Sequence, residues 1–175
     1  MNHILFGTVS LAMLAAQFGL GQGGPPPGGR GAPPPAKQTI DFVTAKKIAA
    51  AVEAAAVAEK AVVSIAVVDS SGDLVYFQRM DDAAARAVTS AQGKARAALL
   101  FGIPTKQVNE AITSGKPVSL ILTAPVGTNE LTTMQGGLPL LKDGKTIAAV
   151  GVGGSSPAND EKFAQAGLDA LAGGK

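Results

Sequence analysis

The sequence has 175 residues, of which 46% are hydrophobic and 16% charged, and this composition fits one folded domain with a buried core. Tryptophan is absent and there is a single tyrosine, so aliphatic residues and alanine must fill that core. The formal net charge is +2, and the lack of cysteine excludes disulfides, thiolate metal sites and cysteine nucleophiles.

The N-terminal segment is apolar. Residues 4–20 read ILFGTVSLAMLAAQFGL, which is typical of the hydrophobic region of a signal peptide. We therefore predict a signal peptide over residues 1–21 and a secreted or periplasmic protein with no stable membrane span after cleavage. A retained N-terminal anchor is the alternative, although the segment is short for a spanning helix. Cleavage removes His3, the only histidine, so the exported chain is expected to contain none.

Residues 22–38 are rich in glycine and proline, which indicates a disordered spacer before a folded domain over residues 39–175. Arg30 and Lys37 lie in this spacer, and 13 basic and 13 acidic residues remain outside it. The domain is therefore formally neutral. Because it also lacks a basic cluster, we expect no binding to nucleic acid.

The first predicted elements of the domain are a helix and two strands. Asp41 is typical of a helix cap, and the helix is expected to end near Lys60. Its apolar face recurs at spacings of three and four and consists of Phe42, Ala45, Ala49, Val52 and Ala56. The run AVVSIAVVD (61–69) is apolar on both faces and predicts a covered central strand. The turn DSSGD then leads to LVYFQRM (74–80), the predicted partner strand of a hairpin.

Two helices are predicted in the middle of the chain. Residues 81–102 favour a helix that ends at Gly102, before Pro104. One face of this helix carries mostly small residues, namely Val88, Ala91, Ala95 and Ala98. A short helix follows with Thr105 as its predicted cap, and the segment PVSLILTAPV (117–126) fits either a strand or a buried loop.

The C-terminal region predicts a hairpin and a helix. The sequence LPLLKDGKTIAAVGVGG (138–154) is expected to turn at Asp143-Gly144. Ser156 is the predicted cap of the last helix, with Pro157 at its first position. Because hairpins join the strands, we predict the α+β class, with a mostly antiparallel sheet covered by helices in a single domain.

Three blocks, SIAVVDSSGDLVYFQRMD, SAQGKARAALLFGIPT and QGGLPLLKDGKTIAAVGVGGSSPANDEKFAQAGLDAL, resemble the GlcG/HbpS-like family, which is related to the C-terminal domain of PduO-type proteins. The resemblance covers residues 41–171 and implies a profilin-like fold with about five antiparallel strands. It also implies a homo-oligomer, and haem as a ligand of some members. The matching motif positions are Gly72, Asp81, Lys94, Gly136, Gly137, Pro139, Gly144, Gly151 and Glu161. The chain departs from the family at GVGGSS (151–156), where GVSG is more usual.

Glycine pairs stand at both ends of the C-terminal hairpin. If the chain turns as predicted, Gly136-Gly137 and Gly153-Gly154 arrive at the same open end. They then either line a shallow pocket whose backbone N–H groups meet a ligand carboxylate, or let two backbones pack closely. A phosphate cradle is disfavoured because GVGGSS lacks the lysine of a P-loop.

Lys94 shares the small-residue face of its helix, so its ammonium group is expected to reach solvent or to meet a carboxylate. Asp81 and Glu161 are the predicted partners. Three roles stay open for this lysine: it binds the carboxylate of a ligand, it acts as a base, or it forms a structural ion pair. A Ser90–Lys94 nucleophile pair carries little weight because that spacing is common by chance.

Haem requires an axial ligand or a suitable apolar slot. Without a histidine, the choices are a methionine, Tyr76, a lysine or an open site. Met134 is the predicted metal ligand, because it lies just before the Gly136-Gly137 pair. Met80 and Tyr76 are alternatives that fit ordinary packing equally well or better. Arg79 is the candidate partner for a haem propionate.

The sequence therefore predicts an exported binding protein for haem or another carboxylate-bearing small molecule, rather than an enzyme. The predicted ligand-binding residues are Lys94, Met134, Gly136, Gly137, Gly153, Gly154 and Arg79. One alternative is a lysine-dependent isomerase or lyase acting on a small organic acid through Lys94 and Asp81. The other is a structural oligomer without a ligand.

Overall fold

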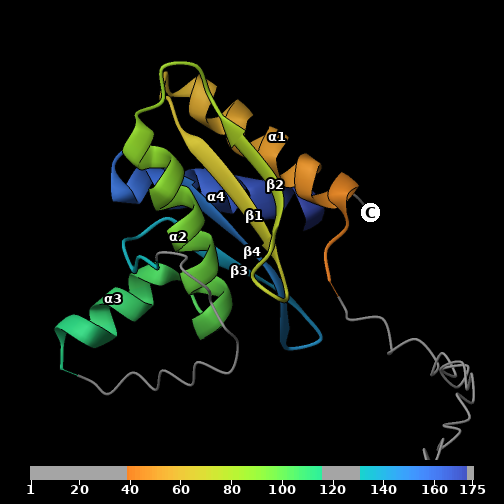
Figure 1. The fold of residues 1–175 in the computed structure, drawn as a ribbon, viewed down its shortest axis with the longest axis vertical. Helices are drawn as coiled ribbons and strands as arrows, with labels where there is room; N and C mark the ends of the chain where they lie inside the picture. The colour runs from red at the N-terminus through yellow and green to blue at the C-terminus, as the bar shows by residue number, and fades with distance from the viewer. Residues whose placement is uncertain (1–38, 116–130, 173–175) are drawn as a thin grey trace, which may run out of the picture. The chain divides into compact units, whose positions relative to one another are not determined.

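The computed structural model of the protein describes residues 39–115 and 131–172, which belong to one compact unit (Figure 1). Its elements are, in order, α1 (Phe42–Ala58), β1 (Ser64–Asp69), β2 (Leu74–Arg79), α2 (Ala85–Phe101), α3 (Thr105–Thr113), β3 (Gly137–Lys142), β4 (Lys145–Gly153) and α4 (Pro157–Ala172). The predicted α+β class is confirmed. The segment 117–126, which fits a strand or a loop, lies outside the described residues, as do the predicted signal peptide and spacer.

The described strands form one antiparallel sheet in the order β2-β1-β4-β3. β1 is covered on both edges, as its apolar run predicts, because Ser64 pairs with Arg79 of β2 and with Gly153 of β4. The second hairpin brings Gly137 opposite Gly151. The sheet therefore places the glycine-rich ends of β3 and β4 side by side.

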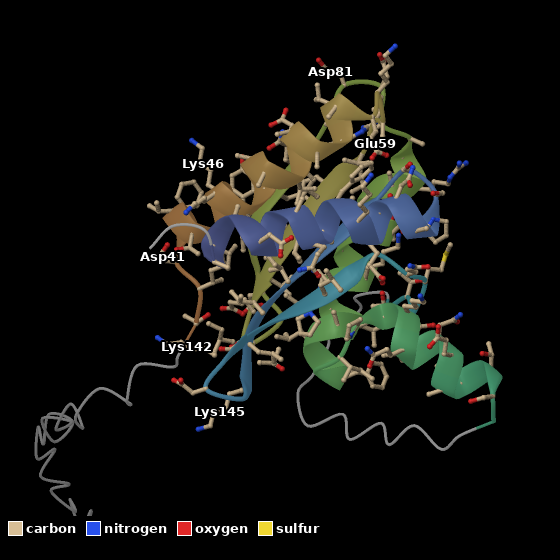
Figure 2. All side chains as sticks on the ribbon, turned by 180° about the vertical axis from the view of Figure 1, so that it is seen from behind. Asp41, Lys46, Glu59, Asp81, Lys142 and Lys145 are labelled. Atoms are coloured by element: carbon tan, nitrogen blue, oxygen red, sulfur yellow. The ribbon has the colours of Figure 1, made fainter. Side chains whose placement is uncertain are left out.

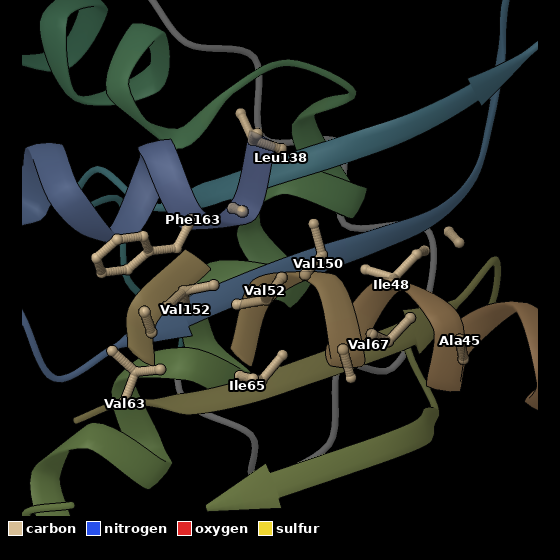
Figure 3. Close-up of a cluster of buried hydrophobic side chains, with 14 of the residues drawn as sticks. Ala45, Ile48, Val52, Val63, Ile65, Val67, Leu138, Val150, Val152 and Phe163 are labelled. Carbon is tan, nitrogen blue, oxygen red and sulfur yellow. The ribbon is translucent and has the colours of Figure 1, made fainter. Parts of the chain in front are cut away.

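The two faces of the sheet carry side chains of different size. α1 and α4 cover one face, where they enclose a cluster that we call the aliphatic core (Figures 1 and 3). Its members include Ile48, Val52, Ile65, Val67, Val150, Val152 and Phe163. α2 covers the other face, where the buried residues are mainly alanine, and we call this the small-residue layer. It consists of Ala66, Val68, Ala91, Ala95, Ala98 and Ala149.

Strand alternation explains this division. Successive side chains of a strand point to opposite faces, so β4 sends Val150 and Val152 to the aliphatic core. The intervening Ala149 and Gly151 face α2. The run AVGVG (149–153) in β4 thus sorts valine to one face and alanine and glycine to the other.

The predicted local signals at the helix starts and at the hairpin turn are confirmed. Asp41 caps α1 by accepting a hydrogen bond from the Thr44 N–H at 2.7 Å. Ser156 accepts one from the Asn159 N–H at 3.3 Å at the start of α4. The β3–β4 turn has φ of 51° at Asp143 and 73° at Gly144, which is the pattern of a type I′ turn.

Two residues of the first two predicted helix faces lie elsewhere. Phe42 is 58% exposed rather than buried, and its ring lies 5.9 Å from that of Tyr76, while Ile48 takes a core position. Val88 is half-buried, and α2 begins at Ala85 rather than at Asp81. The physical reason is that Asp82 has a positive φ of 64° and Ala84 is extended, so this stretch is a turn.

Thr105 is not the cap of α3. The N-cap position belongs to Pro104, and Thr105 is the first helical residue. Its buried hydroxyl accepts a hydrogen bond from the Gly137 N–H at 2.9 Å, which ties the start of α3 to β3. Among the described residues, no helix has the length and apolar character needed to cross a membrane.

Candidate functional site

A buried ion pair lies between three elements. The Lys94 ammonium nitrogen of α2 lies 2.7 Å from Asp160 Oδ2 of α4 and 2.8 Å from the carbonyl oxygen of Val152 in β4. Both side chains are almost fully buried, with 1% of Lys94 and 3% of Asp160 exposed. Of the two outcomes expected for Lys94, solvent or a carboxylate, the structure shows the carboxylate.

The predicted partners of this lysine were wrong. Asp81 is exposed, and Figure 2 shows it at one end of the unit, opposite the hairpin tip that carries Lys142 and Lys145. Glu161 accepts a hydrogen bond from the Gln135 side chain at 3.1 Å instead. Adjacent helix residues point about 100° apart, so only one of two neighbouring acids can face Lys94.

Asp160 also holds the loop between β4 and α4. Its Oδ1 accepts a hydrogen bond from the Ser155 N–H at 3.0 Å, while Oδ2 accepts from Lys94. The carboxylate therefore links α2, the glycine-rich loop and α4 at one point. A buried carboxylate satisfied at both oxygens is the arrangement that offsets its loss of hydration.

Gly136 makes room for the ion pair. A Cβ atom at this position would lie 2.8 Å from the Lys94 ammonium and 2.7 Å from Asp160 Cβ. Its φ of 123° is also a conformation that favours glycine. The glycine is thus required by the contact between Lys94 and Asp160.

The other glycines bring backbones together. A Cβ at Gly137 would overlap the Lys94 carbonyl, and one at Gly153 would lie 2.9 Å from the Ala87 carbonyl oxygen. A Cβ at Gly154, whose φ is 130°, would lie 2.6 Å from the Val62 carbonyl oxygen. Both glycine pairs do meet at the open end of the hairpin, as predicted. Close backbone packing, one of the two predicted roles, accounts for these three glycines.

Two hollows open beside the ion pair. The inner hollow has a volume of about 250 Å³ and is bordered by Arg86, Ala87, Ser90, Lys94, Met134, Gly154, Ser155, Pro157 and Asp160. The outer hollow has a volume of about 370 Å³ and is bordered by Arg86, Thr89, Ser90, Gly93, Leu131, Thr132 and Met134. Because Arg86, Ser90 and Met134 border both, the two hollows adjoin, and we call them together the depression.

The charges around this depression sum to a positive value. Among the described residues that border it, Arg86 and Lys94 are cationic and Asp160 is the only acid. Met134 is 54% exposed, so its thioether is available to a ligand. An ammonium that donates to a carboxylate is a hydrogen-bond donor rather than a base, so the arrangement favours binding over proton abstraction.

Not all of the predicted site residues border the depression. Lys94, Met134 and Gly154 do, and Gly136 and Gly153 lie against its walls. Arg79 does not, because its side chain donates through Nε to the Ala83 carbonyl at 2.9 Å. Tyr76 and Met80 pack against the aliphatic core, as ordinary packing predicts.

The sequence analysis identified neither Arg86 nor Asp160 as a site residue. A usable signal was present, because Arg86, Ser90 and Lys94 recur at spacings of four and therefore lie along one stripe of α2. No group of three or more acidic or histidine side chains suited to a metal ion occurs within 39–115 and 131–172.

Known proteins resemble this chain in sequence and in fold. Residues 40–169 match the family described as haem degrading protein HbpS-like. An uncharacterised 15.0 kDa protein of Citrobacter freundii, from the dhaT-dhaS intergenic region, is 35% identical over 131 residues, which is 75% of this chain and 91% of that protein.

Solved structures agree with this match. A double mutant of HbpS from Streptomyces reticuli is 27% identical, with a TM-score of 0.68 over 93% of this chain and 99% of that one. The structure of a PduOC–haem complex is 23% identical, with a TM-score of 0.66 over 75% and 94% of the two chains, and this likeness concerns the fold.

Proposed function

Because the chain belongs to the HbpS-like family, which has haem-binding members, we propose that it is a binding protein for haem or a similar flat, carboxylate-bearing molecule. The observation that carries this proposal is the depression beside Lys94. It combines an exposed thioether, an exposed cation and a buried ammonium within two hollows that share three residues. Concave sites with a few convergent polar groups are the usual form of small-ligand sites.

The residues around the depression have the chemical groups that a haem site uses. A methionine thioether is one of the side chains that ligate haem iron, and Met134 is the candidate. Leu131 offers apolar surface in the outer hollow, and Arg86 offers a cation to a propionate. When bound, the haem would supply the redox and ligand chemistry of its iron.

We further propose that the protein is exported and that it forms a homo-oligomer. The apolar N-terminal sequence supports export. The resemblance to the GlcG/HbpS-like family, which implies a homo-oligomer, supports assembly. N-terminal sequencing of protein collected outside the cytoplasm tests export, since a start beyond residue 21 is expected. Light scattering with and without haemin tests assembly.

The test of function is a titration of tag-free protein with haemin. We expect a shifted Soret band that saturates at a fixed ratio of haemin to protein. The Met134→Leu variant should alter the position of this band, because leucine has a similar size and no thioether. Met80→Leu serves as the matched control, since Met80 packs against the aliphatic core. A change no larger than that given by an unrelated protein would contradict the proposal.

A further inference from the structure

We propose that the inner hollow is a receptor for a single carboxylate group, whose buried hydrogen-bond donor is the Lys94 ammonium. The inference rests on the proposed function for its ligand, because it assigns which part of that ligand the protein recognises. It also extends to carboxylates that carry no porphyrin, and these allow it to be tested separately.

The Lys94 ammonium uses two of its three hydrogens within the described part of the chain. An ammonium group has three N–H donors. Two of them are used by Val152 O at 2.8 Å and Asp160 Oδ2 at 2.7 Å. The described residues provide no acceptor for the third, although Lys94 borders the inner hollow. A buried donor without an acceptor is unfavourable, so an acceptor in the hollow stabilises the site.

The Lys94 ammonium is held in place before any ligand arrives. Gly136 leaves the space that the nitrogen occupies, and Asp160 is itself fixed by the Ser155 N–H at 3.0 Å. A donor that is already fixed loses little conformational freedom when a ligand binds, and this raises affinity. A lysine on a free stem does not have this property.

The charge and the volume of the inner hollow both favour a small anion. Within the inner hollow, Asp160 balances Lys94, and Arg86 on the rim leaves one positive charge uncompensated. This favours an anion over a neutral molecule. Ser90 adds a hydroxyl on the same stripe of α2, one turn from each of the two cations. The volume of about 250 Å³ suits a short carboxylate arm or a small organic acid.

The probe is sodium propionate, compared with propionamide, which has the same shape and no charge. Binding is followed by amide chemical shifts in isotope-labelled protein. We expect propionate to shift the signals of Ser90, Gly154 and Ser155 in a saturable way, and propionamide to have little effect. Equal shifts from both compounds, or no saturable shift from propionate, would overturn the inference.

A suitable variant removes the Lys94 donor without unfolding the protein. Lys94→Met alone strands a buried carboxylate, so the informative variant is Lys94→Met with Asp160→Asn, in which asparagine can still accept from Ser155. We expect its propionate affinity to fall about tenfold or more, as for loss of a hydrogen bond to a charged group. Arg86→Gln should weaken binding only about two- to fivefold, because Arg86 is exposed.

The matched control is Lys106→Gln, an exposed charge change on α3 outside the bordering residues. Its propionate affinity should match that of the unmodified protein. If the double variant binds propionate equally well, the inference is wrong even where haemin still binds. If propionate binds and haemin does not, the receptor stands and the haem proposal fails.

Discussion

The two faces of the sheet bury their residues in different ways. The aliphatic core fills the space under α1 and α4 with branched side chains and one phenylalanine. The small-residue layer has few side-chain atoms to bury, so α2 approaches the sheet closely enough for its backbone to oppose Gly137, Gly151 and Gly153. The difference shows that one face is stabilised by side-chain volume and the other depends on the absence of side chains.

The buried ion pair lies where the two faces meet, because Lys94 belongs to α2 and Asp160 to α4. The stem of Lys94 can reach Val152 O and Asp160 only because the strands under α2 carry glycine at the points of contact. On the aliphatic face, branched side chains occupy the corresponding volume. The two faces should therefore respond in opposite ways to changes in residue size.

The largest effect is expected from adding atoms to the small-residue layer. Gly151→Val places side-chain carbons against the Ala91 carbonyl and the Ala95 N–H, which are backbone groups of α2 and cannot rotate away. The loss should exceed about 4–5 kcal/mol, which is exceptional for one substitution. We expect little soluble protein and no cooperative thermal transition. A folded variant with an unchanged melting temperature would contradict the close packing of α2.

The next effect concerns the ion pair. Lys94→Met leaves the Asp160 carboxylate buried without its cation, which should cost about 3–5 kcal/mol. Adding Asp160→Asn removes the stranded charge, so the double variant should recover a large part of this loss. Urea unfolding of the unmodified protein, both single variants and the double variant measures the coupling. A double-variant loss equal to the sum of the two single losses would show that the two groups do not interact.

Removing atoms from the aliphatic core should have the next largest effect. Ile65→Ala deletes buried methyl groups between β1 and the helices, with an expected loss of about 2–5 kcal/mol. Its neighbour Ala66 points to the small-residue layer and serves as the comparison. Ala66→Gly removes one carbon only and should cost less in the same urea experiment. The reverse order of the two losses would disprove the assignment of the faces.

The smallest effect lies outside both faces, at the exposed cap of α1. The N–H of Thr44 lowers the pKa of the Asp41 carboxyl by hydrogen bonding to its charged form. A pKa below the unfolded value of 3.8 contributes stability above that pH, and the contribution is lost as the pH falls through the folded pKa. Asp41→Ala should lower the melting temperature by roughly 2–4 °C at neutral pH.

This difference should shrink in acid. Asp41→Ala and the unmodified protein are expected to have converging melting temperatures as the pH drops below the folded pKa of Asp41. A difference that stays constant down to that pH would show that the cap acts through something other than its charge.

Local signals in the sequence predicted most of the fold. The turn at Asp143 and the cap at Asp41 depend on residues a few positions apart, so the sequence alone contains their cause. Phe42 was assigned to the buried face of α1 because it fits the helical period, but its side chain lies over Tyr76 at the edge of the core. Which apolar residue occupies the margin of a face depends on the neighbouring element.

The candidate site was predictable only in part. The burial of Lys94 follows from the alanines that share its helix face, but the choice between Asp160 and Glu161 depends on the rotational phase of α4 against α2. That phase is a property of tertiary packing. Arg86 is separated from Met134 by the whole middle of the chain, and the sheet topology brings them to one depression.

The fit between Gly136, Lys94 and Asp160 has a consequence for how such sequences diverge. Each of the three residues is tolerable only because the other two are present, since the glycine leaves the space, the lysine fills it and the acid neutralises it. Substitution of any one alone is expected to lower the stability of the fold. Descendants of this protein should therefore retain all three or exchange them together, and the trio should be inherited as a single unit.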